Sequence, residues 1–316
     1  MLKIRLNLVL IAVVLGVFSV SANAQTKGQD PSQESERSDK FTGGKIETGE
    51  LVPSQPDVKL TLNIPAFRLS LWQNGKEVKT YWVGVGRREF PLIAGDRSTK
   101  QIIWNPDWIP PDSDWVHAMK GVQAGEIIKA SDSRNPIGRV KIPIGDGFLI
   151  HQAHPGDAGH LVSHGCIRLA LPDLYDLSDS LVEALSLPVT VEQIERAKKS
   201  KRLLVANFDK AVEVDVNYDT LVVEGGMLHI YPDVYGHGTS TVKELRAELE
   251  SSGVDSSTLD DKTIKAMIAK AGKGMEYIVS VDSIKAGRAL EDGRVESVVP
   301  RPEPKKKAEV AELRAH

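Results

Sequence analysis

The chain contains a single cysteine, Cys166, within the segment Ser-His-Gly-Cys-Ile-Arg at 163–168. A thiol attacks a carbonyl group as the thiolate, and a nearby imidazole can take its proton and stabilise the charge. Four of the eight histidines lie between His151 and His164, so candidate bases are concentrated near the sulfur. A lone cysteine is either an inert buried residue or a free reactive thiol, and these neighbours favour a nucleophile.

His151 and the residues next to the sulfur have different expected roles. His151 follows the apolar run 147–150, so it lies at a strand end, a rigid place from which to aim a base. Gly165 lets backbone N–H groups approach an oxyanion, as acyl transfer requires. The guanidinium of Arg168 suits a carboxylate, and fastening the loop is an equally good interpretation of this residue.

A metal site is the main chemical alternative in this segment. His160 and His164 are four residues apart, a spacing that suits metal ligands on a helix. Gly156 and Gly159 indicate a loop instead, and no carboxylate-plus-histidine set completes a zinc site. We therefore expect no metal and no cofactor, and we interpret His154 and His160 as loop residues.

The first 24 residues are typical of a secretory signal peptide. Lys3 and Arg5 precede an apolar stretch at 6–20, and Ala-Asn-Ala at 22–24 supplies a cleavage site. The stretch is shorter than the ~20 residues that a spanning helix needs, so we expect cleavage, no membrane span afterwards and a periplasmic location. Removing Lys3 and Arg5 from 40 basic residues leaves 38 against 43 acidic ones, which argues against nucleic-acid binding.

Alternation of polar and apolar residues predicts β-strands before the cysteine. The alternation covers residues 59–64, 68–72 and 78–85, and shorter apolar runs cover 101–104, 138–144 and 147–151. Asn74-Gly75 is a strong signal for a hairpin turn between the second and third of these strands. The spacing predicts a mainly β fold, a sandwich or barrel, instead of alternating βα units.

Helical spacing begins after the cysteine. The apolar residues that repeat on one helix face are Leu174, Leu177, Leu181 and Leu185. Strand-like alternation returns at 187–191 and 212–223. Capping patterns that begin at Thr241 and Ser257 then predict two further helices.

These patterns divide the chain into five segments. They are a signal peptide (1–24), a polar flexible linker (25–50), a catalytic domain (51–195), a small C-terminal extension of strands followed by two helices (196–290) and a charged disordered tail (291–316). The extension has no matching nucleophile or base. We therefore expect the region after about residue 240 to be dispensable for the chemistry of Cys166.

The segments 149–151 and 162–169 resemble the active-site signature of the L,D-transpeptidases, the YkuD-type cell-wall enzymes. Upstream, the segment 63–86 resembles the family's opening hairpin, and Asn-Pro-Ile-Gly at 135–138 resembles its segment before the histidine strand. The resemblance covers about residues 57–195 and implies a YkuD-like β-sandwich with a few helices.

Three departures from the family pattern affect the pocket rim and donor specificity. One is that the loop from His151 to Cys166 is a residue or so shorter than usual. Gln152 replaces the glycine that usually follows the first histidine, and the segment 90–95 replaces a Thr-Pro-Thr-Gly run.

The resemblance implies a cysteine acyltransferase that acts on peptidoglycan stem peptides. The third residue of a tetrapeptide would acylate Cys166 and release D-alanine. An amine acceptor would then resolve the thioester to a 3→3 cross-link or to a protein attachment. His151 would be the general base, and the backbone carbonyl of Gln152 would orient its ring.

Supporting roles follow from the same resemblance. Ser163, His164 and Gly165 would shape the turn that carries the nucleophile, and the N–H groups of Gly165 and Cys166 would bind the oxyanion. Arg168 would bind a stem-peptide carboxylate. The expected partners are stem peptides and, for protein attachment, a wall-attached lipoprotein.

Three other functions compete with this one. The same fold could use water as the acceptor, as an L,D-carboxypeptidase or as a hydrolase that releases a wall-attached lipoprotein. A papain-like protease needs its histidine downstream of the cysteine, whereas His151 comes first. A non-enzymatic wall-binding module has no need of a free cysteine beside histidines in an oxidising compartment.

Overall fold

The computed structural model describes residues 57–257 and 259–300. The predicted signal peptide and linker lie outside the described residues, as does the end of the predicted tail. Within the described part, every helix is too short or too polar to cross a bilayer.

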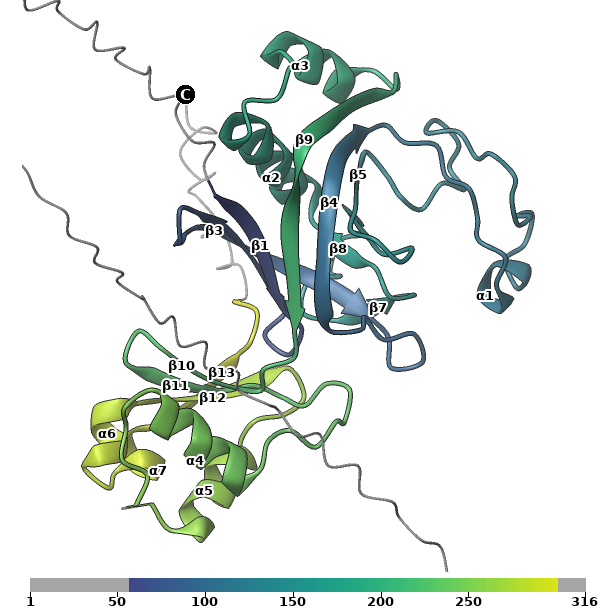
Figure 1. Cartoon of the computed structure of the whole chain (residues 1–316). Helices are drawn as coiled ribbons and strands as arrows, with labels where there is room; N and C mark the ends of the chain where they lie inside the picture. Colours follow the sequence, from purple (N-terminus) through teal and green to yellow (C-terminus); the bar gives the residue numbers. More distant parts are fainter. Residues whose placement is uncertain (1–56, 258, 301–316) are drawn as a thin grey trace, which may run out of the picture. The chain divides into compact units, whose positions relative to one another are not determined.

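Nine strands form a large sheet (Figure 1). They are β1 (Val58–Asn63), β2 (Arg68–Gln73), β3 (Lys76–Gly86), β4 (Gly95–Trp104), β5 (Val140–Pro143), β6 (Leu149–Gln152), β7 (Leu161–Ser163), β8 (Ile167–Leu169) and β9 (Leu204–Asn217). Their order is β2-β1-β9-β4-β5-β6-β8-β3-β7, and β2 also pairs with β3. The hydrogen-bonded path therefore returns to its start and encloses the main apolar core. The mainly β class is confirmed.

The long strand β3 joins two parts of this sheet. Its first half pairs with β2, with Arg68 opposite Trp82, and its second half pairs with β8, with Val83 opposite Leu169. The predicted hairpin turn at Asn74 and Gly75 is confirmed, since it connects β2 to β3. Both residues have positive φ angles, 51° and 73°, the conformation for which Asn-Gly is favoured.

Two helices follow β8. The helix α2 (Leu171–Ala184) is confirmed by the burial of its leucines at Leu174, Leu177 and Leu181. The predicted strand at 187–191 is wrong, because α3 (Val191–Lys199) begins there. Thr190 caps α3 by accepting a hydrogen bond from the N–H of Gln193, whose side chain accepts one in return from Thr190.

Strand β9 lies in the span that the sequence assigned to the C-terminal extension, yet it belongs to the large sheet. It is parallel to β1 and antiparallel to β4, and Figure 1 shows it between them. Val212, Val214 and Val216 are buried and face the core, and they alternate with exposed or partly buried residues. The predicted strand at 212–223 is in fact two strands, because β9 ends at Asn217 and the next begins at Leu221.

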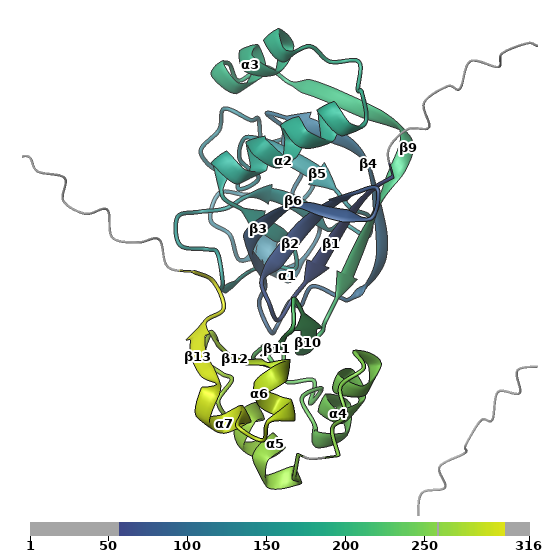
Figure 2. The same ribbon diagram turned by 90° about the vertical axis from the view of Figure 1, so that its left-hand side faces the viewer.

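The rest of the extension has its own small sheet and core (Figure 2). The strands are β10 (Leu221–Glu224), β11 (Met227–Ile230), β12 (Met275–Ser280) and β13 (Arg294–Ser297), antiparallel in that order. The helices are α4 (Val242–Ser251), α5 (Asp261–Ile268), α6 (Val281–Lys285) and α7 (Ala289–Asp292). Thr241 caps α4 as predicted, but Asp260, and not Ser257, caps α5. Strand β13 lies inside the predicted tail.

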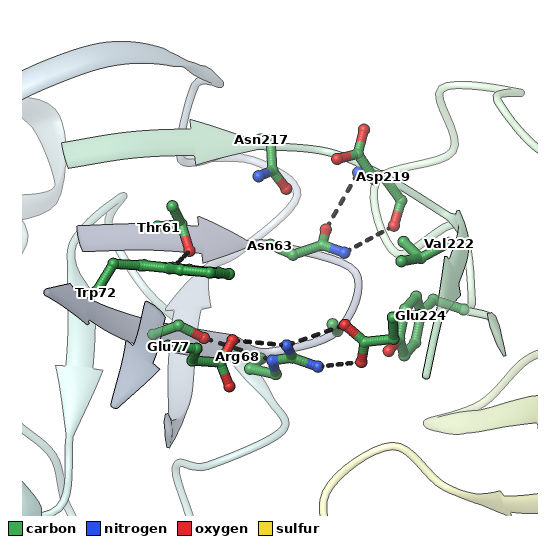
Figure 3. Close-up of a pocket in the computed structure, with 12 residues that line it drawn as sticks. Thr61, Asn63, Arg68, Trp72, Glu77, Asn217, Asp219, Val222 and Glu224 are labelled. Atoms are coloured by element: carbon green, nitrogen blue, oxygen red, sulfur yellow. Dashed lines mark hydrogen bonds and ion pairs between the residues drawn. The ribbon is translucent and has the colours of Figure 1, made fainter. Parts of the chain in front are cut away.

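A charged cluster connects the extension to β2 (Figure 3). Both terminal nitrogens of Arg68 donate to the carboxylate of Glu224, at 2.5 and 3.1 Å, and one also reaches Glu77 at 3.0 Å. Beside it, Asn63 and Asp219 exchange two hydrogen bonds at 2.9 and 3.1 Å. These contacts tie residues 219–224 to β1 and β2.

Tyr235 brings the extension close to the residues that follow β3. Its hydroxyl donates to the carbonyl of Gly86 at 2.9 Å and accepts from the N–H of Leu92 at 3.1 Å. Arg88 also donates to the carbonyl of Val234 at 2.8 Å. A chain cut near Val234 would lose the contacts of Tyr235. Both residues precede residue 240, so the dispensability of the later region stays a prediction.

We expect Tyr235→Phe to lower the free energy of unfolding by about 1–3 kcal/mol, because it leaves a partly buried N–H and carbonyl without their partner. Tyr175→Phe is the matched control, since the Tyr175 hydroxyl makes no hydrogen bond within the described residues, and its effect should stay within about 0.5 kcal/mol. Urea unfolding measures both variants. Equal stability of the two variants would contradict this role for Tyr235.

Candidate active site

The sequence-predicted residues come together because β6 and β8 run in parallel. Their register places His151 opposite Arg168, and Cys166 directly precedes β8. His151, Cys166 and Arg168 line one cavity of about 670 Å³ together with Ser163 and His164. The structure thus brings together the side chains that the sequence proposed for catalysis.

Cys166 is a free, partly exposed thiol at this cavity. Burial raises its pKa above the usual thiol range, while the backbone N–H of Leu149 and the charge of Arg168 act in the opposite direction. Because burial dominates, the resting residue at neutral pH is a thiol.

His151 is 4% exposed. Burial, and after it the neighbouring charge of Arg168, lower its pKa to about 4, although the backbone carbonyls of Ile137 and Gln152 act in the opposite direction. The imidazole is therefore neutral at pH 7 and free to accept a proton. Its Nδ1 atom is buried and has no hydrogen-bond partner among the described residues, so a bond to the Gln152 carbonyl stays a prediction.

A tight turn holds the sulfur. The Ser163 hydroxyl donates to the carbonyl of Cys166 at 2.5 Å and accepts from the N–H of Gly165 at 3.1 Å. The expectation of a free Gly165 N–H for an oxyanion is therefore wrong in this conformation. Gly165 has φ +108°, and a Cβ there would lie 2.7 Å from the ring of Phe148 and strain the backbone.

His164 is held by aromatic rings. It stacks on Trp115, with ring centroids 4.3 Å apart, and contacts the edge of Phe90 at 4.8 Å. Its Nε2 atom contacts the guanidinium of Arg87. Burial lowers the pKa of His164, and the charges of Arg87 and Arg168 add to this, so the ring is a neutral part of the cavity wall.

Asp157 is a site residue that sequence reasoning missed. Its carboxylate accepts from Arg168 at 3.1 Å and from the N–H of His154 at 2.8 Å, and it is buried. This pairing favours the loop-fastening interpretation of Arg168. The only sequence signal was an acidic residue in a Gly-rich loop, which has many possible roles.

Gln152 has a structural use where the family pattern has glycine. Its Oε1 atom accepts from the N–H of Arg139 at 2.9 Å, and its side chain fills the space beside Gly138. A Cβ at Gly138 would lie 2.4 Å from that oxygen. Gln152 therefore fastens the segment before β5 to the histidine strand.

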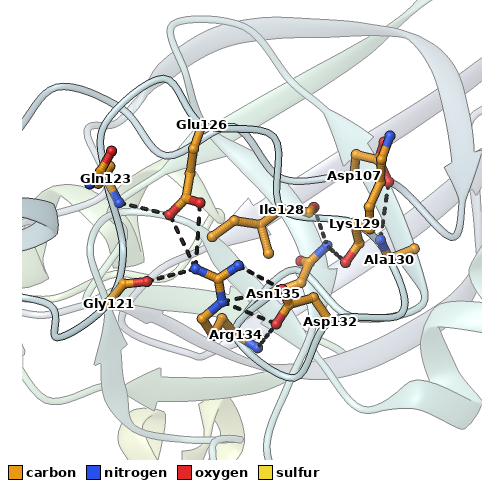
Figure 4. A network of polar contacts seen from close by, with 10 residues as sticks. All are labelled: Asp107, Gly121, Gln123, Glu126, Ile128, Lys129, Ala130, Asp132, Arg134 and Asn135. Carbon is orange, nitrogen blue, oxygen red and sulfur yellow. Dashed lines mark hydrogen bonds and ion pairs between the residues drawn. The ribbon is translucent and has the colours of Figure 1, made fainter.

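Residues 105–139 form a cap over the cavity that the sequence did not predict. The cap includes α1 (Asp114–His117) and has a small apolar core of Trp108, Val116, Val122, Ile128 and Ile137. Figure 4 shows a polar network on this segment, in which Arg134 binds Asp132 at 2.7 Å and the carbonyl of Gly121 at 2.6 Å. Because the cap has its own apolar core and polar network, it forms an ordered wall of the cavity.

His154 and His160 lie outside the cavity that Cys166 and His151 line. Both are in the loop between β6 and β7. Over residues 57–257 and 259–300, no group of three or more His, Cys, Asp or Glu side chains could hold a metal ion.

The fold and cavity can now be compared with known proteins. Residues 57–191 match the family model YkuD, described as the L,D-transpeptidase catalytic domain. This segment is a YkuD domain. No curated protein matches the chain.

Solved structures similar to the chain include L,D-transpeptidases. The enzyme from Mycobacterium smegmatis has 13% identity and a TM-score of 0.30, with 51% of this chain and 59% of that chain covered. L,D-transpeptidase 3 from Mycobacterium tuberculosis, in complex with a faropenem-derived adduct, has 15% identity and a TM-score of 0.30 over 51% and 60%. The catalytic domain from E. faecium, acylated by ertapenem, has 19% identity and a TM-score of 0.28 over 36% and 81%. The chain spans about three fifths of the length of the first two.

Gly165→Ala in the YkuD domain should lower the free energy of unfolding by about 1–3 kcal/mol and slow alkylation of Cys166 by iodoacetamide. The cause is the contact of the new Cβ with Phe148 in addition to backbone strain. Gly156→Ala is the matched control, since its φ of +88° brings strain with nothing within 4 Å. If the two variants alkylate at the same rate, the contact with Phe148 does not hold the turn.

The pH dependence of alkylation tests the charge state of the pair. Burial raises the pKa of Cys166 and lowers that of His151 to about 4, so neither changes charge between pH 5 and 8. The rate should then rise about tenfold per pH unit across this range, following the thiolate fraction, with no inflection near 6.5 where an ordinary histidine titrates. A plateau over this range would instead reveal a preformed thiolate–imidazolium pair.

Proposed function

We propose that the chain is an exported cysteine acyltransferase of peptidoglycan stem peptides, an L,D-transpeptidase. One observation carries the proposal: Cys166 and His151 line the same cavity of a YkuD domain. The cavity is large enough for several residues of a peptide, and the cap gives it an apolar wall. The proposal implies a periplasmic location, in accord with the signal peptide predicted at 1–24.

The first step would be acylation of Cys166. As Sγ attacks the carbonyl carbon of the third residue of a tetrapeptide, its proton passes to His151. The imidazole is in the unprotonated form that this step needs, because burial and Arg168 hold its pKa far below 7. Collapse of the tetrahedral intermediate breaks the bond to D-alanine, whose nitrogen takes the proton from the imidazolium.

The second step would transfer the acyl group. An amine acceptor attacks the thioester, His151 takes the proton of the amine, and the thiol is regenerated. The imidazolium that forms in each step is unstable beside Arg168, which favours its rapid deprotonation. The Cys166 N–H is the proposed oxyanion donor, since the Gly165 N–H is already bound to Ser163.

We also propose a revised domain division. The catalytic unit would run to Asn217, because β9 completes the large sheet. The extension would then begin at Tyr218. Its core is separate, while Tyr231, Tyr235 and Val298 pack on the catalytic unit.

A carbapenem adduct tests the nucleophile and the base. We expect intact-protein mass spectrometry to show one adduct on the wild type and none on Cys166→Ala. His151→Ala should slow acylation by roughly 10²–10⁴-fold, the usual contribution of a general base. His154→Ala is the control, and it should acylate at the wild-type rate. An adduct on Cys166→Ala would remove the basis of this proposal.

Purified tetrapeptide muropeptides identify the acceptor. New 3→3 dimers in the product masses are expected for a transpeptidase. Tripeptides alone would mean that water is the acceptor, as in an L,D-carboxypeptidase. Release of a peptide from a lipoprotein-linked muropeptide, without dimers, would mean a hydrolase of wall attachments. No product from any of these substrates would favour a binding module.

A further inference from the structure

Three neighbouring strands place three basic side chains in one row across the cavity floor. Lys141 of β5 is paired with His151 of β6, and His151 is paired with Arg168 of β8. All three line the cavity. Because directly paired residues project from the same face of a sheet, the two cations flank the imidazole, with backbones about 5 Å away on each side.

Among the described residues, Lys141 is the cation of this row that forms no ion pair. Arg168 is bound to Asp157 at 3.1 Å. The carboxylate of Asp107, which also lines the cavity, is bound to Lys129 at 2.8 Å and to the N–H of Ala130 at 3.0 Å. Within the described residues Lys141 takes part in no ion pair, so its charge is left to face the cavity.

The surroundings of Lys141 make an anionic occupant favourable. Its side chain is half-buried in β5, and burial lowers its pKa while Asp107 acts in the opposite direction. A charge that has lost part of its water is stabilised by an opposite charge placed beside it. On the cap side, the cavity is lined by the indole rings of Trp108 and Trp115, and the carboxylate of Asp107 there is already paired, so an anionic group of an occupant is best placed on the side of the strands.

We propose that Lys141 is a substrate-binding residue that contacts a carboxylate of the donor stem peptide. The inference rests on the proposed function. The sequence analysis gave the binding of a stem-peptide carboxylate to Arg168, but a terminal N–H of Arg168 already donates to the buried carboxylate of Asp157. The inference assigns that binding to Lys141, which the sequence analysis did not single out. A carboxylate at Lys141 would lie one strand away from His151, which positions the peptide beside the thiol.

The test compares full-length wild type, Lys141→Gln and Lys141→Arg on three disaccharide tetrapeptides. One has all its carboxylates free, one is amidated on the side-chain carboxyl of the third residue, and one is amidated on the terminal D-alanine. Lys141→Gln should lower kcat/KM for the free substrate by about 10- to 100-fold, mainly through KM, because a charge-assisted contact is lost. Lys141→Arg should recover most of it.

The amidated substrates show which carboxylate is bound. On the substrate that lacks that carboxylate, wild type and Lys141→Gln should have equal kcat/KM values. Alkylation of Cys166 by iodoacetamide, which has no carboxylate, should be the same in both proteins. Lys100→Gln, the same change at an exposed position of β4, should behave as wild type. Circular dichroism and thermal unfolding confirm that each variant is folded.

Two results would overturn the inference. The first is an unchanged kcat/KM for folded Lys141→Gln on the free substrate. The second is an equal loss on all three substrates and in alkylation, which would mean that Lys141 acts on the thiol. Failure of the wild type to react with any tetrapeptide is a separate result, and it would overturn the proposed function itself.

Discussion

The parallel pairing of β6 with β8 is the constraint on which the candidate site depends. It fixes His151 beside Arg168 and leaves Cys166 at the first position outside the ladder. Both strands are short, so the pairing needs support from both sides. β5 supplies it next to β6, and β3 next to β8. Gly86, near the end of β3, has no room for a side chain, because a Cβ there would lie 2.9 Å from the Cα of Gly165. The turn that carries the sulfur is thus packed against backbone, which limits its freedom to move.

The electrostatics of the site follow from the same arrangement. A buried imidazole next to a guanidinium is held neutral, and a buried thiol is held protonated. A protonated thiol is less nucleophilic than a thiolate, so the resting sulfur reacts slowly with other electrophiles. In the proposed mechanism, the proton would pass to His151 as the sulfur attacks a bound carbonyl. Positioning of the substrate therefore matters more here than in a site with a preformed ion pair.

Local patterns in the sequence were enough to predict the elements closest to the chemistry. The Asn74-Gly75 turn and the helix at Leu174 depend on neighbours a few residues away, and the Ser-His-Gly-Cys motif at Cys166 is itself a local pattern. The failures have a different origin. Thr190 begins a helix where alternation at 187–191 indicated a strand, since a capping box outweighs a short pattern. β9 pairs with β1 and β4, which are distant in the chain. The ion pair of Asp157 with Arg168 depends on how the loop folds. A single sequence shows neither.

The position of β9 also determines when the catalytic unit can form. In register, Lys59 lies opposite Glu213, and the strand that contains Glu213 is inserted between β1 and β4. All residues of the candidate site precede β9 in the chain. During synthesis or export from the N-terminus, Cys166 is therefore present before β9 can complete the sheet. Such long-range pairing is slow to form, since the entropy of closing a long loop is lost before the contacts are gained. Until β9 pairs with β1 and β4, the strands that position Cys166 are therefore not enclosed in a complete sheet, although the Ser163 contacts that hold its turn are local.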